Sequence, residues 1–101
     1  MSASDDRWAP KAERLARKIE PHLRAITTVE LVHAATTCPF TAVECKDASG
    51  CILTGDDRDS IPVYELAALL SRYFASVEVH DRGMAATFTV SRPRAEPLLA
   101  P

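Results

Sequence analysis

The chain has 101 residues, of which 47% are hydrophobic and 26% are charged, and its formal net charge is −2 at pH 7. This size and composition suit one globular domain with its own core, and they exclude a disordered or fibrous chain. The slightly acidic balance argues against a general nucleic-acid binder, whose surface is usually strongly basic.

The first predicted element is an N-terminal helix with a break. Apolar residues recur at helical spacing from Trp8 through Leu15 and Ile19 to Ile26. Pro21 removes a backbone donor, so the helix should break near residue 20.

Residues 7–24 hold six basic and two acidic residues, and residues 44–65 hold six acidic and two basic ones. The candidate surface for a charged partner comprises Arg7, Lys11, Arg14, Arg17 and Lys18.

Two segments in the middle of the chain allow two structures each. Residues 27–36 are rich in β-branched residues and predict a strand, although Thr27 and Glu30 have the spacing of a helix capping box. If 27–36 were helical, the C-terminal hairpin would resemble the wing of a helix-turn-helix protein, and the basic residues from Arg7 to Arg24 could bind DNA. Residues 41–46 fit a strand or one helical turn.

The reactivity expected of the Cys38 thiol depends on whether the residues after it form a strand or a helix. If 27–37 is a strand and 41–47 a short helix, the Cys38 thiolate lies at a helix N-terminus, which stabilises it. The resulting βαβαββ order resembles the TusA family of sulfur carriers, whose CPxP motif begins with a persulfide-bearing cysteine. This chain has Cys38-Pro39-Phe40-Thr41, with threonine in place of the second proline. The similar features downstream are Thr54-Gly55-Asp56-Asp57, Ile61-Pro62 and the final hairpin. The resemblance implies a thiol carrier as an alternative function.

The next elements are a short strand at 51–54 and an apolar helix at 61–75. Asp59 or Ser60 would cap this helix, with Pro62 in its first turn. Its only charged residues are Glu65 and Arg72, so it must be covered on more than one side, by the chain's own sheet or by a second molecule. The candidate interface residues on it are Leu66, Leu69, Leu70, Tyr73 and Phe74.

A β-hairpin closes the predicted domain. Val77 and Val79 alternate on one strand, Ala86, Phe88 and Val90 alternate on the next, and the turn contains Gly83. Prolines 93, 97 and 101 then predict a loose tail over 93–101. We therefore expect one α+β domain over residues 1–92, with both helices on one face of a four- to five-stranded, mostly antiparallel sheet. The other face would be open and would invite dimerisation.

Several sequence motifs that would indicate a location, a cofactor or a catalytic activity are missing. It has no apolar run of membrane-spanning length and no signal-peptide pattern at its start, so we expect a cytoplasmic protein. Cys38, Cys45 and Cys51 lack paired metal-ligand spacing, so we expect no metal or cofactor. Nucleophile-elbow, HExxH and phosphate-loop motifs are also missing. The sequence therefore favours a non-catalytic regulatory or accessory module that binds another protein or itself as a homodimer.

Overall fold

The computed structural model describes the backbone of residues 3–35, 38–56, 61–81 and 85–96, and the side chains of 8–31, 43–55, 61–81 and 85–96. The helical elements are α1 (Ala3–Ile19), the 3₁₀ helix η1 (Glu20–His22) and α2 (Val63–Tyr73). The strands are β1 (Thr28–Ala35), β2 (Cys38–Lys46), β3 (Ile52–Asp56), β4 (Phe74–Asp81) and β5 (Ala85–Pro93).

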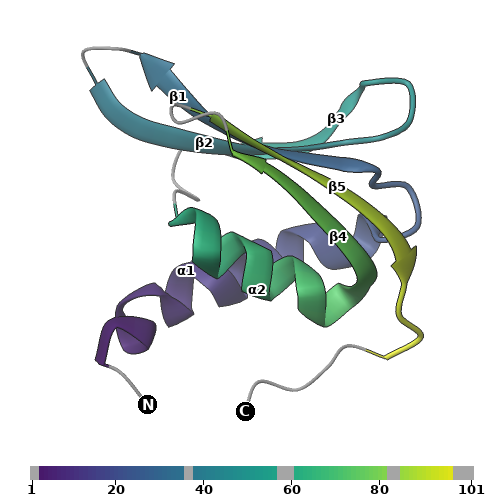
Figure 1. The fold of residues 1–101 in the computed structure, drawn as a ribbon, viewed down its shortest axis with the longest axis horizontal. Helices are drawn as coiled ribbons and strands as arrows, with labels where there is room; N and C mark the ends of the chain where they lie inside the picture. Colours follow the sequence, from purple (N-terminus) through teal and green to yellow (C-terminus); the bar gives the residue numbers. More distant parts are fainter. Residues whose placement is uncertain (1–2, 36–37, 57–60, 82–84, 97–101) are drawn as a thin grey trace.

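The five strands form one antiparallel sheet in the order β3-β2-β1-β5-β4. Both helices lie on the same face of this sheet, as Figure 1 shows. The predicted α+β class, the five-stranded antiparallel sheet and the C-terminal hairpin β4–β5 are confirmed. Strand β1 lies at the centre because it pairs with β2 on one side and with β5 on the other.

The N-terminal helix breaks where proline requires it. α1 ends at Ile19, and η1 follows with Pro21 in its first turn, where the missing N–H costs least. Leu15, Ala16 and Ile19 are buried, so the apolar stripe of α1 faces the core. The predicted break near residue 20 is confirmed.

Two of the open choices in the middle of the chain are settled as strands. β1 alternates buried Val29 and Leu31 with partly exposed Thr28 and Glu30, a pattern of period two that suits a sheet with one covered face. The helical alternative for 27–36, and the winged helix-turn-helix arrangement that depended on it, is therefore wrong. Residues 41–46 belong to β2, so the alternative of a short helix after Cys38 is also wrong.

Helix α2 passes directly into β4 without a loop. The helix ends at Tyr73, and Phe74 is already extended at φ −123° and ψ 137°. The observed helix is therefore shorter than the predicted 61–75. Pro62 is the N-cap residue rather than part of the first turn, and the predicted caps Asp59 and Ser60 lie outside the described residues.

One core lies between the helices and the sheet. Phe88 at the centre of β5 is fully buried and lies opposite Val29 on one side and Val79 on the other. The other fully buried large side chains are Leu15, Ile19, Val29, Val43, Cys45, Leu66, Leu70 and Phe74. Among the described residues, no helix has both the length and the apolar character needed to cross a membrane.

The chain remains attached to the fold just beyond β5. The backbone N–H of Arg94 donates to the Tyr73 carbonyl at 2.7 Å, and its guanidinium Nε donates to the Ser71 carbonyl at 3.2 Å. Both acceptors lie in the last turn of α2, where helix carbonyls lack intrahelical partners. Of the predicted tail 93–101, residues up to Glu96 are described, and Arg94 is held against α2.

Candidate protein interface at the outer edge of the sheet

The residues predicted as an interface on α2 lie inside the chain's own core. Their side chains are at most 4% exposed, and α2 packs against α1, β4 and β5 of the same chain. The five are Leu66, Leu69, Leu70, Tyr73 and Phe74. The helix therefore needs no second molecule to cover them, which removes the reason for placing the interface there.

The solvent side of α2 explains how so apolar a sequence can be a surface helix. Tyr64, Ala68 and Ser71 follow one another at spacings of four and three and are exposed. Two of these three are small, so little apolar area faces solvent. Ser71 Oγ also donates to the Ala67 carbonyl at 2.8 Å, so its hydroxyl is satisfied within the helix. Helix α2 has few charged residues because its solvent face carries small residues and its buried face carries large apolar ones.

The predicted basic surface divides along α1. Helical spacing places Lys11, Arg14 and Lys18 on one flank, and Lys11 Nζ lies 5.5 Å from the centre of the Trp8 ring. Arg17 lies apart from them and donates to Glu13 at 2.9 Å, with both side chains mostly exposed, so this pair adds little stability. The side chain of Arg7 lies outside the described residues. A charged partner on this flank stays a prediction.

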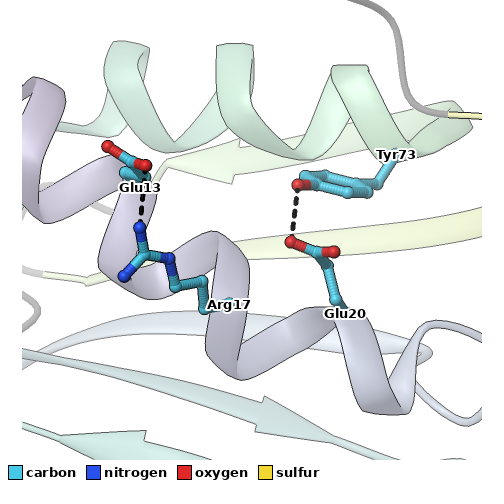
Figure 2. A network of polar contacts seen from close by, with 4 residues as sticks. All are labelled: Glu13, Arg17, Glu20 and Tyr73. Carbon is cyan, nitrogen blue, oxygen red and sulfur yellow. Dashed lines mark hydrogen bonds and ion pairs between the residues drawn. The ribbon is translucent and has the colours of Figure 1, made fainter.

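The 3₁₀ helix η1, which directly follows α1, contacts the end of α2 through a polar pair drawn in Figure 2. The Tyr73 hydroxyl donates to Glu20 Oε1 at 3.3 Å. Burial raises the pKa of the Tyr73 phenol, and the negative charge of Glu20 raises it further. The folded chain therefore favours the neutral phenol, which is the form able to donate this hydrogen bond.

This raised pKa predicts a loss of stability at alkaline pH. The unfolded chain releases the tyrosine proton near pH 10, so the contribution is fully present below that pH and is lost as the pH rises towards the higher folded-state pKa. Tyr73→Phe is expected to lose at most about 1 kcal/mol at neutral pH and to unfold with a shallower pH dependence above about pH 10. Thermal melts of both proteins from neutral to alkaline pH measure this difference. Identical pH dependences would contradict it.

None of the three cysteines lies at the N-terminus of a described helix. Cys38 is the first residue of β2, so no helix N-terminus lies there to stabilise a thiolate; its side chain is outside the described set. Cys45 is buried and Cys51 is exposed, and neither is in a disulfide. Among the described side chains, no three His, Cys, Asp or Glu residues gather as metal ligands do.

Among the described side chains, the open face of the sheet is polar where β1 pairs with β5. Thr28 and Glu30 of β1 lie opposite Thr89 and Thr87 of β5, and Lys46 Nζ lies 3.2 Å from Glu30 Oε2. Glu44 Oε1 is 4.0 Å from the same ammonium. The described side chains at the centre of this face thus offer hydrogen bonds and charge rather than apolar area. Dimerisation through the open face stays a prediction.

The two edges of the sheet differ in how they are protected. β3 is five residues long, contains Gly55 and pairs with β2 through an irregular register. β4 is eight residues long, contains no proline or lysine, and pairs with β5 without a register shift. Short edges and bulges discourage pairing with another chain, whereas a long regular edge invites it. The unprotected edge is β4.

The backbone of β4 directs hydrogen-bonding groups outward at alternate residues. The backbone N–H of Val90 in β5 donates to the carbonyl of Thr27, the residue just before β1, at 3.0 Å. The backbone groups of Val90 therefore point towards β1 and away from β4. Its partner Val77 therefore forms a non-hydrogen-bonded pair with it and directs its own N–H and C=O to the open edge. By alternation Val79 does the same, while Glu78 directs its groups towards β5.

The side chains at this edge are apolar on one face and ionisable on the other. Val79 lies opposite the buried Phe88, on the helix-covered face, yet it is 43% exposed. On the open face, Glu78 Oε2 lies 4.0 Å from His80 Nε2, and both side chains are mostly exposed. Within the described residues, the outer edge of β4 thus combines outward-pointing backbone groups, an exposed valine and a carboxylate beside an imidazole.

Comparison of the chain with protein-family models, curated proteins and solved structures gave no match. The edge site was not predicted from the sequence, because both strands of the hairpin show the same alternation of apolar and polar residues. Their difference arises when β5 pairs with β1 and leaves β4 outside.

Proposed function

We propose that this protein is a small non-catalytic protein-binding module, regulatory or accessory in role, that forms a homodimer by adding β4 of one copy to β4 of another. The observation that carries the proposal is the outer edge of β4, which is long, regular and unpaired among the described residues. Strand addition obtains its affinity from main-chain hydrogen bonds and its specificity from alternate side chains.

A second copy is the partner that best fits this edge. A two-fold dimer uses the same patch on both subunits, so the patch must complement itself. An antiparallel pair of identical strands meets this condition for the backbone, because each outward N–H finds an outward C=O on the other strand. The exposed Val79 adds apolar area that two copies can cover together.

The alternatives have less support. A thiol carrier needed a helix beginning at Cys38, where the chain begins a strand instead. The nucleic-acid hypothesis is supported only by the basic flank of α1, because the described fold has no helix-turn-helix arrangement. Neither is supported by a second observation.

Val79→Pro tests the proposal directly. The N–H of Val79 points away from β5, so proline removes a donor that only an added strand would use, and edge positions of this kind tolerate proline. Each dimer loses two hydrogen bonds, and we expect self-association to weaken at least about tenfold. Sedimentation velocity over a range of concentrations measures the dissociation constant.

Two controls separate binding from folding. Val79→Thr keeps the β-branched shape and the N–H, so it should associate much as the wild type does. Glu78→Pro removes a donor that points towards β5, so it should unfold the hairpin, as circular dichroism would show. A wild type that stays monomeric at all concentrations, or a folded Val79→Pro variant with unchanged association, would refute the proposal.

A further inference from the structure

We infer that the two copies pair about a two-fold axis through Val79, so that Glu78 of each copy lies opposite His80 of the other. This inference rests on the proposed strand addition and specifies its register. The argument uses the direction of the backbone groups, the exposure of the valines and the charges on the open face.

Symmetry leaves few registers. Two identical antiparallel edge strands related by an axis perpendicular to the sheet must place one residue opposite its own copy. In the middle of β4 that residue is Val77, Glu78 or Val79. In all three registers the helices of both copies lie on the same face of the joined sheet.

A register centred on Glu78 is disfavoured by charge. Glu78 directs its backbone groups towards β5, so it would meet its copy as a non-hydrogen-bonded pair, with Cα atoms only about 4.5 Å apart. Two carboxylates directly opposite each other at this spacing repel. This register brings Val77 close to Val79, but only at that cost.

A register centred on Val77 leaves the polar side chains poorly matched. It places His80 opposite Phe74, whose side chain is 1% exposed and packed into its own core. Glu78 would lie opposite Ser76, and the exposed Val79 would meet only the methyl group of Ala75. No charge complementarity results.

A register centred on Val79 pairs the exposed valine with its own copy and each Glu78 with a His80. Val79, the more exposed of the two valines, lies against its own copy as a hydrogen-bonded pair. Glu78 lies opposite His80 twice, at the closer spacing of non-hydrogen-bonded pairs. Since Glu78 and His80 already lie 4.0 Å apart within one chain, the dimer would hold two carboxylates and two imidazoles in alternation. Asp81, exposed at the end of the strand, would lie opposite Val77.

Charge exchange tests the pairing of side chains. Glu78→Lys places a cation opposite His80, and His80→Glu places two carboxylates opposite each other, so each is expected to weaken the dimer about tenfold. The double variant Glu78→Lys/His80→Glu places a cation and a carboxylate opposite each other across the axis and should recover most of the affinity. Glu96→Lys makes the same charge change away from β4 and should leave association unchanged.

Cysteine cross-linking tests the axis itself, in a background with Cys38 and Cys51 replaced by serine. At the axis, a Cα separation of about 5.5 Å lies within the range of a disulfide. Val79→Cys should therefore oxidise to a covalent dimer, whereas Val77→Cys should not.

The outcomes distinguish the two proposals. Preferential cross-linking of Val77→Cys, cross-linking of neither variant, or failure of the double charge exchange to recover affinity would overturn the register. If Val79→Pro still weakens association in that case, strand addition stands. If Val79→Pro has no effect, the proposed function fails as well.

Discussion

Leu70→Asp is expected to abolish folding of the isolated chain. Leu70 is fully buried between α2 and the rest of the core. An unpaired carboxylate at this position costs several kcal/mol in desolvation and loses the packing of the leucine as well. Domains of this size have a total stability of about 5–15 kcal/mol. We expect the variant to lose its cooperative thermal transition, measured by circular dichroism.

Ala68→Asp on the same helix is the matched control. Ala68 is exposed on the solvent side of α2, so the same carboxylate there should change stability by no more than about 0.5 kcal/mol. If Leu70→Asp instead gave a folded monomer from an associating wild type, Leu70 would be an interface residue and its burial within one chain would be disproved.

Phe88→Ala is expected to cost about 3–5 kcal/mol, the second large effect. Phe88 is 0% exposed and lies in β5 between Val29 of β1 and Val79 of β4. Its loss leaves a cavity where β5 joins the hairpin to β1. Equilibrium unfolding in urea measures the change as a lower midpoint.

The neighbouring threonine shows whether that effect comes from burial. Thr89→Ala changes the next residue of the same strand, on the open face, where its side chain is exposed. We expect a change below about 1 kcal/mol, arising from β-propensity alone. Equal losses for Phe88→Ala and Thr89→Ala would show that the core does not lie on the helix-covered face of β5.

Elements with strong local signals were predicted well. Pro21 was predicted to break the first helix, and α1 ends at Ile19 with Pro21 in the first turn of η1. The alternation of Val77 and Val79 with Phe88 and Val90 identified the hairpin, since period two is the property of one strand with one covered face. The β-branched content of 27–36 outweighed the capping-box spacing, because β1 pairs on both sides and each pairing satisfies its backbone.

Choices that needed knowledge of neighbouring elements were left open by the sequence. The apolar stretch at 61–75 needed cover from its own sheet or from a second molecule, and α1 and the hairpin cover its large residues. Residues 41–46 fitted a strand or one helical turn, and pairing of β2 with both β1 and β3 made them a strand. In both cases the deciding contacts are far apart in the chain.

The class of the fold, the break after the first helix and the alternation of the two hairpin strands were determined by the sequence itself, because helical breaks and alternation are properties of neighbouring residues. Which strand lies at the edge, and which backbone groups point outward from it, was decided by tertiary structure. Both follow from the pairing of β5 with β1, a contact between residues about sixty positions apart. That pairing leaves β4 exposed and makes its outer edge the candidate interface.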